Sequence, residues 1–135
     1  MAAEASALLG NVPLFSGLDP RELETISRTV HERTFDEGDV VAEEGQGGVG
    51  FFVIRDGEAK VTVGGNEVRR LGPGDYFGEI ALISEGARTA TVTAETRLRC
   101  YGLTPWEFRP LVQTNAGIAW KILQALARQV DSQRH

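Results

Sequence analysis

The chain has 135 residues, of which 41% are hydrophobic and 24% charged, with a formal net charge of −5. This composition is that of one ordinary globular domain, and the acidic balance argues against a broad nucleic-acid-binding face, which needs clustered Lys and Arg. One cysteine and two histidines exclude an internal disulfide and a metal centre built from several His or Cys ligands.

The N-terminal residues have no positively charged region followed by a long apolar run, so we expect no secretory signal. No stretch reaches the length of a membrane span. We therefore expect a cytoplasmic protein with no membrane partner and no nucleic-acid partner in this chain. The alternative that the chain is a piece of a larger protein stays open.

Residues 1–32 are predicted to form a helical lead-in. Asp19-Pro20 supplies an N-cap followed by proline at the first helical position, and Glu22 stands three residues after the cap. Leu23 and Ile26 then continue the chain with helical spacing.

Residues 33–103 change to the pattern of short strands punctuated by turns, and most of the 16 glycines lie here. Ala59, Val61 and Val63 alternate with polar residues, which is the period of a half-buried strand. Six segments are predicted as strands: Val40-Val41, Phe51 to Ile54, Ala59 to Val63, Val68 to Leu71, Thr91 to Thr93 and Leu98 to Leu103. Many short strands with tight turns predict a mainly β protein, an antiparallel roll of the jelly-roll type.

Three turn signals separate these strands. Asp56-Gly57 predicts a hairpin between the strands on either side of it, and Gly64-Gly65 and Pro73-Gly74 predict two further turns. The glycine-rich run of residues 45–50 lacks the Gly-Lys-Ser/Thr ending of a phosphate loop, so we interpret it as an ordinary hairpin loop.

Residues 104–135 are predicted to form a pair of helices. Thr104-Pro105-Trp106-Glu107 has the pattern of a capping box, Pro110 limits or kinks the first helix, and Asn115 can cap the second. The second helix has an apolar arc of about 220°, wider than docking on one surface needs.

The chemically informative segment runs from Gly74 to Val92. Gly78 allows close approach of the backbone, and residues 79–83 can form one helical turn whose free N–H groups suit an anion. Arg88 adds a planar cationic fork that matches phosphate oxygens, and ionised Glu79 accepts hydrogen bonds from hydroxyls. A ligand with an anionic end and a hydroxyl end, such as a sugar phosphate, fits this set.

Two motifs, Phe77-Gly78-Glu79-Ile80-Ala81-Leu82 and Arg88-Thr89-Ala90-Thr91-Val92, resemble the phosphate-binding cassette of cyclic-nucleotide-binding domains, here residues 77–91. Such domains occur in cAMP- and cGMP-dependent kinases, gated channels and catabolite-activator-type regulators. The resemblance spans about Val12 to Val130 and includes Glu44-Gly45, the strand before Gly57 and the N-terminal helices. One departure is Ala87, where the family usually has proline.

The resemblance implies a role for each cassette residue. Arg88 would pair with the cyclic phosphate, and the backbone N–H groups of Ala81 and Thr89 would complete its cradle. Glu79, with the Gly78 amide, would hold the ribose 2′-hydroxyl, and the Thr89 hydroxyl could reach the base. The expected binding set also includes Ile80 and Ala90. The ligand is then cAMP or cGMP, with cAMP ranked first, and no prosthetic group or metal is expected.

The resemblance also implies that the C-terminal helix supplies a base-capping group, for which Trp120, Gln124 and Arg128 are the candidates. Movement of this helix would report occupancy to an unidentified effector protein or domain. Its wide apolar arc would cover the base, pack on a second copy as a homodimer, or do both.

Three other interpretations of the sequence are open. An enzyme on a similar roll, as in cupins, is disfavoured because no catalytic set of histidines, nucleophiles or paired carboxylates is present. The fold could have lost its ligand and serve as an interaction domain. The chain could also be the regulatory part of a transcription regulator or enzyme.

Overall fold

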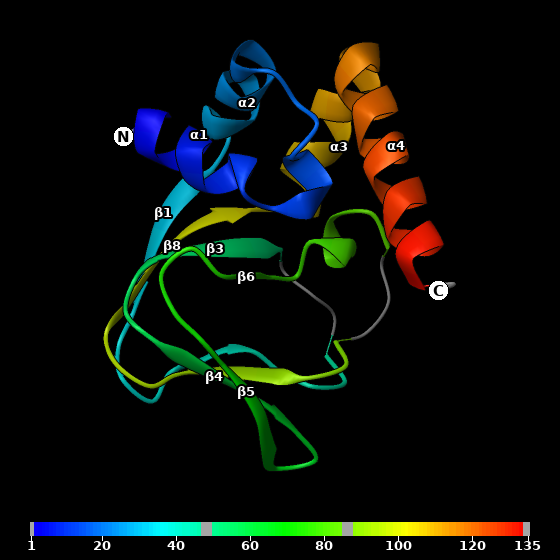
Figure 1. Ribbon diagram of the computed structural model, residues 1–135. Helices are drawn as coiled ribbons and strands as arrows, with labels where there is room; N and C mark the ends of the chain where they lie inside the picture. The colour runs from blue at the N-terminus through cyan, green and yellow to red at the C-terminus, as the bar shows by residue number, and fades with distance from the viewer. Residues whose placement is uncertain (1, 47–49, 85–87, 134–135) are drawn as a thin grey trace. The chain divides into compact units, whose positions relative to one another are not determined.

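The computed structural model describes residues 2–46, 50–84 and 88–133, which form two compact units. One unit, residues 31–105, contains all the strands and is called the roll. The other unit combines the segments before residue 31 and after residue 105 and is helical (Figure 1).

The roll consists of two four-stranded antiparallel sheets, which Figure 1 shows facing each other. One sheet has the order β1-β8-β3-β6 and the other has the order β2-β7-β4-β5. The strands are β1 (His31–Phe35), β2 (Val40–Ala42), β3 (Phe51–Asp56), β4 (Ala59–Val63), β5 (Asn66–Leu71), β6 (Tyr76–Phe77), β7 (Thr91–Ala94) and β8 (Leu98–Leu103). The predicted antiparallel roll, with helical segments before and after it in the chain, is therefore confirmed.

The core of the roll contains inward-facing side chains from both sheets. Phe52 packs against Phe77 with ring centroids 5.3 Å apart. Phe51 and Val53 are buried as well, so β3 is buried on both faces, which explains its continuous apolar sequence. The core residues are Val41, Ala42, Phe52, Ile54, Ala59, Leu71, Phe77, Val92, Ala94, Leu98 and Cys100.

Two strands were not predicted. β1 begins at His31, so the roll starts two residues before the predicted boundary at 33. Its first four residues are exposed and mostly polar, and only Phe35 turns partly inward, so the strand carries little hydrophobic pattern. β6 has two residues, too few to show any period.

The predicted turns have different outcomes. Gly64-Gly65 joins the paired strands β4 and β5, and both glycines have positive φ (59° and 84°), as a tight hairpin requires. The hairpin predicted at Asp56-Gly57 is wrong, because β3 and β4 lie in different sheets. Gly57 is needed there for another reason: a Cβ at this position would clash with the carbonyl oxygen of Arg97.

The glycine-rich connection between β2 and β3 also passes from one sheet to the other, so it is not a hairpin loop. Residues 47–49 of this run lie outside the described residues. Gly50, at its end, has φ +147°, and a Cβ there would lie 2.5 Å from the carbonyl oxygen of Leu103.

The helical unit contains α1 (Ala2–Gly10), the short 3₁₀ helix η1 (Pro13–Phe15), α2 (Pro20–Ser27), α3 (Pro105–Thr114) and α4 (Ala116–Gln133). The capping box of α2 is confirmed: the Glu22 N–H donates to Asp19 Oδ1 at 2.9 Å, and the Asp19 N–H donates to Glu22 Oε1 at 3.0 Å. Pro110 lies inside α3, and the carbonyl of Asn115 accepts the N–H of Ala119 at the start of α4.

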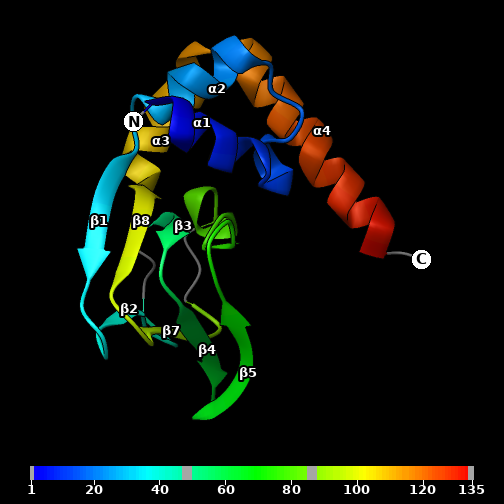
Figure 2. The same cartoon turned by 60° about the vertical axis from the view of Figure 1, so that its left-hand side comes forward.

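The last helix joins the N-terminal segment within this unit. Lys121 Nζ donates to Glu22 Oε1 at 2.6 Å, so α4 contacts the capping box of α2. Ile118 and Ile122 are buried, whereas Trp120 is 62% exposed. Figures 1 and 2 show the C-terminal half of α4 extending beyond α1 and α3.

Candidate functional site

A cavity of about 520 Å³ lies in the roll, a volume suited to a small molecule. All of its described lining residues fall between Ala42 and Val92. The structure brings all seven of the predicted roll residues to this cavity: Gly78, Glu79, Ile80, Ala81, Arg88, Thr89 and Ala90. Residues 85–87 of the cassette, including Ala87, lie outside the described residues.

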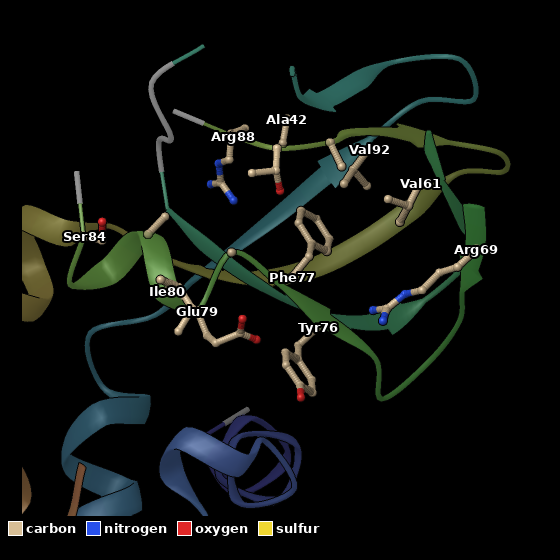
Figure 3. A pocket seen from close by; sticks show the side chains of 14 residues that line it. Ala42, Val61, Arg69, Tyr76, Phe77, Glu79, Ile80, Ser84, Arg88 and Val92 are labelled. Atoms are coloured by element: carbon tan, nitrogen blue, oxygen red, sulfur yellow. The ribbon is translucent and has the colours of Figure 1, made fainter. Parts of the chain in front are cut away.

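Arg88 supplies a half-buried cationic group to one side of the cavity (Figure 3). Its Nη2 donates to the carbonyl oxygen of Gly50, and its buried Nε has no hydrogen-bond partner among the described residues. Burial lowers the pKa of Arg88, and the nearby charge of Glu79 opposes this effect. An arginine remains charged at neutral pH, so an incompletely paired guanidinium here favours an anion.

The backbone of Arg88 is fixed by the segment that follows β2. The Arg88 N–H donates to the carbonyl of Gln46 at 3.0 Å, and the Gly45 N–H donates to the carbonyl of Arg88 at 2.9 Å. The Glu44 N–H donates to Oγ1 of Thr91, the last residue of the cassette, at 3.0 Å. Hydrogen bonds with residues 44–46 therefore hold the Arg88 backbone and the Thr91 side chain in place.

Gly78 precedes a short 3₁₀ turn, η2 (Ile80–Leu82), which corresponds to the predicted helical turn. Its φ is +84°, and a Cβ at this position would lie 2.5 Å from both Arg88 Nη1 and the Gly50 carbonyl oxygen. The N–H of Ala81 donates to the carbonyl of Gly78 at 3.1 Å. This N–H, which the resemblance assigns to phosphate, would have to share or leave that bond to reach a ligand.

Glu79 presents a partly buried carboxylate to the cavity. Burial raises its pKa above the ordinary value, while hydrogen bonds from the backbone N–H groups of Ile80 and Glu79 and the charges of Arg69 and Arg88 oppose the rise. No side chain among the described residues forms an ion pair with it. An ionised carboxylate in this position can accept hydrogen bonds from ligand hydroxyls.

The sequence interpretation missed three polar residues of the cavity, Arg69 on β5, Tyr76 on β6 and Ser84 after η2. Arg69 stands two residues before the buried Leu71, so strand alternation places it on the inner face, and this signal was available in the sequence. The wall between these polar groups is apolar and is formed in part by Ala42, Val61, Phe77 and Val92.

The three predicted base-capping residues, Trp120, Gln124 and Arg128, lie on α4 in the helical unit, and all three are exposed. The terminal Nη2 of Arg128 lies 3.5 Å from the Cβ position of Gly17 in the same unit. Their role toward a ligand stays a prediction.

The cavity thus offers a cationic end at Arg88, a carboxylate at Glu79, an apolar wall, and a second cation at Arg69. A small molecule with an anionic group, a hydroxyl and a flat apolar part matches this order of groups. The described residues contain no cluster of three metal-ligating side chains. Within the same ranges, no helix has the length and hydropathy of a membrane span.

Comparison with protein families gives one matching model, described as the cyclic nucleotide-binding domain, over residues 32–115. The match covers both cassette motifs and every described strand after the start of β1.

Curated proteins and solved structures give related matches. The chain is 43% identical over 94 residues to a cAMP-dependent protein kinase regulatory subunit of Schizosaccharomyces pombe, covering 69% of this chain and 23% of that protein. It is 36% identical over 101 residues to a cGMP-dependent protein kinase of Toxoplasma gondii, covering 75% and 10%. The chain therefore spans a quarter or less of these two relatives.

The N-terminal domain of a transcriptional regulator from Streptomyces coelicolor A3(2) is similar to this structure. The TM-score is 0.88 at 28% sequence identity, and the match covers 93% of this chain and 94% of that one.

Proposed function

The chain belongs to the cyclic nucleotide-binding domain family, and from this premise we propose that it is a sensor module that binds cAMP or cGMP reversibly. The observation that carries the proposal is the convergence of Arg88, Glu79 and the other cassette residues on one cavity. The names of the two kinase relatives contain cAMP and cGMP respectively. We propose cAMP as the preferred ligand, as expected from the sequence.

The proposed binding step is an exchange of hydrogen bonds at Arg88. The guanidinium donates to the Gly50 carbonyl, and its Nε has no partner within residues 2–46, 50–84 and 88–133. A cyclic phosphate carries a full negative charge and is a stronger acceptor than a carbonyl oxygen, so it would draw the guanidinium into a charge-assisted pair. The ribose hydroxyl would then donate to Glu79, and the base would lie against the apolar wall.

The proposed signal is a shift in the population of α4 positions. A ligand moves such an equilibrium only by the difference between its affinities for the two states. Trp120, Gln124 or Arg128 would provide that difference by contacting the base in one state. Trp120, Leu123 and Val130 are also exposed apolar residues on α4, and we propose that they pack on a second copy or an effector.

We propose binding rather than catalysis, a cytoplasmic location, and a role as the regulatory part of a larger assembly. These proposals rest on the acidic composition, the absence of a catalytic residue set in the sequence and the partial coverage of the relatives.

Calorimetric titration with cAMP, cGMP and the non-cyclic 5′-AMP tests the ligand proposal. Saturable one-to-one binding of a cyclic nucleotide, with weaker binding of 5′-AMP, supports it. Binding of none of the three would favour an interaction domain that kept the fold and lost the ligand. Hydrogen exchange of α4 with and without the bound nucleotide then tests the signal, and unchanged exchange rates would contradict it.

A further inference from the structure

Among the described residues that line the cavity, Arg69 is the charged one that neither cassette motif contains. It lies on β5 directly opposite Val61 of β4, and residues paired across antiparallel strands point to the same side of the sheet. Val61 packs against the core and lines the cavity, so the pairing places Arg69 on the inner face. The neighbouring Arg70 lies opposite Lys60 in the strand register, so its side chain points to the other face of the sheet.

A β-bulge adds to this placement. The register shifts between Val61, which faces Arg69, and Thr62, which faces Glu67, so Val68 has no partner. Bulges bend a strand and re-aim its side chains. Val68 is 57% exposed, although it is apolar, while the charged Arg69, which is also exposed, lines the cavity. A charged side chain on the inner face and an apolar one outside reverse the usual pattern, as is common at binding sites.

Figure 3 shows Arg69 and Arg88 reaching the cavity from opposite sides. In this view the Arg69 guanidinium and the Glu79 carboxylate point toward each other, with Tyr76 below them. Among the described residues, the Arg69 side chain has no hydrogen bond or ion pair, and the Glu79 side chain has no ion-pair partner. Two opposite charges thus face one cavity without a closer partner for either.

A nearby positive charge stabilises the partly buried Glu79 carboxylate more than it would stabilise a fully exposed carboxylate. Burial raises the pKa of Glu79, and among the charged side chains Arg69 opposes the rise more strongly than Arg88. The other titratable group that faces Glu79 is Tyr76, whose own pKa is raised by burial and by the charge of Glu79. When a ligand replaces water in the cavity, the dielectric constant falls and the arginine–carboxylate attraction increases.

We propose that Arg69 is a positioning residue of the nucleotide site, whose charge keeps the Glu79 carboxylate ionised and oriented to accept the ribose hydroxyl while the ligand excludes water. The proposal rests on the proposed function for its ligand. The ribose is common to cAMP and cGMP, so Arg69 supports both nucleotides alike.

The first test measures Glu79 without any nucleotide. The carboxyl carbon of Glu79 is titrated by NMR in the wild type, Arg69→Gln, Arg69→Lys and Arg70→Gln. Arg69→Gln removes the charge and is expected to move the titration midpoint of Glu79 to higher pH, whereas Arg69→Lys retains most of the effect. Arg70→Gln removes an equal charge from the outer face and should leave the midpoint unchanged. An unchanged midpoint in Arg69→Gln overturns the proposal.

The second test measures binding of cAMP and cGMP to the same variants at pH 7.5 and pH 5.5. Arg69→Gln is expected to lose affinity for both by a similar factor, about tenfold. The loss should be larger at pH 5.5, because the protonated carboxyl is a weaker acceptor for the ribose hydroxyl than the carboxylate. In a Glu79→Gln background, Arg69→Gln should have little further effect. Thermal unfolding confirms that each variant is folded.

A loss confined to cGMP would overturn the proposal in favour of a contact with guanine, whose N7 and O6 are both acceptors for an arginine. A wild type that binds neither nucleotide, although the titration midpoint of Glu79 shifts as expected, would show that the proposed function is wrong. In that case the electrostatic effect of Arg69 on Glu79 is still correct.

Discussion

Replacing Gly78 with alanine would add a methyl group to a position that is already filled. The new Cβ would lie 2.5 Å from Arg88 Nη1 and 2.5 Å from the carbonyl oxygen of Gly50, and φ here is +84°. Gly74 is a matched control in the same roll, because its φ is +89° and a Cβ there meets nothing within 4 Å. The two substitutions share the backbone strain and differ in the steric contact.

The magnitudes follow from these two contributions. An L-residue in the left-handed region costs about 1–2 kcal/mol, which is all that Gly74→Ala should lose in free energy of unfolding. Gly78→Ala adds an overpacking cost of about 1–3 kcal/mol, because the Gly50 backbone cannot move as easily as a side chain end. It also displaces Arg88 from the position that faces the cavity.

Urea unfolding and nucleotide titration of the two variants measure both effects. We expect Gly74→Ala to bind like the wild type, and Gly78→Ala to bind at least about tenfold more weakly, or about 1.4 kcal/mol. Equal stabilities and equal affinities of the two variants would refute the steric reasoning and the placement of Arg88 against Gly78.

Three further predictions concern the rest of the roll. Burial raises the pKa of the Cys100 thiol to about 12, so iodoacetamide at pH 8 should alkylate it in unfolded protein and leave folded protein largely unmodified; rapid alkylation of the folded form would contradict its burial. Gly57→Ala should lower the free energy of unfolding more than Gly64→Ala, because a Cβ at Gly57 clashes with the Arg97 carbonyl whereas Gly64 is open; equal losses in urea unfolding would count against this. A hydrogen bond from Arg99 lowers the pKa of Glu32. The ionised carboxylate therefore stabilises the folded protein above the unfolded-state pKa, and this contribution disappears as the pH falls through the folded-state pKa. Glu32→Gln should be less stable than the wild type at pH 7 and equally stable in acid, and a constant difference in stability across that range would contradict the ion pairing.

Local chemistry was sufficient to predict much of the architecture. The capping box at Asp19 and the Gly64-Gly65 hairpin depend on residues within a few positions of each other, and both have the predicted geometry. Cys100 lies in the predicted strand Leu98 to Leu103, and its side chain is fully buried. The two cassette motifs were found because their residue types and spacing are specific.

Features that depend on distant residues were not predicted. Asp56-Gly57 resembles a hairpin turn, but the chain crosses there between two sheets, and only the position of the Arg97 carbonyl explains the glycine. Gly50 is another such case. It lies 38 residues from Arg88 in the sequence, and its carbonyl accepts the hydrogen bond from Arg88 only because the strands bring the two together.

Arg69 is intermediate between these cases. Its alternation with Leu71 predicts an inward side chain, yet a charged residue on an inner face conflicts with the hydrophobic pattern, so the sequence interpretation did not select it. The pairing of Arg69 with Val61 and the shape of the cavity resolve the conflict.

The most direct test of the central claim is calorimetric titration of the wild type, Arg88→Ala and Arg70→Ala with cAMP and cGMP. Each substitution removes one arginine charge. Of these two arginines, Arg88 lines the cavity, whereas Arg70 forms ion pairs with Glu67 and Glu95 outside it. We predict that the wild type and Arg70→Ala bind a cyclic nucleotide with similar affinity and that Arg88→Ala loses about 2–5 kcal/mol of binding free energy. Equal binding by Arg88→Ala, or no binding by the wild type, would contradict the assignment of this cavity as a cyclic nucleotide site.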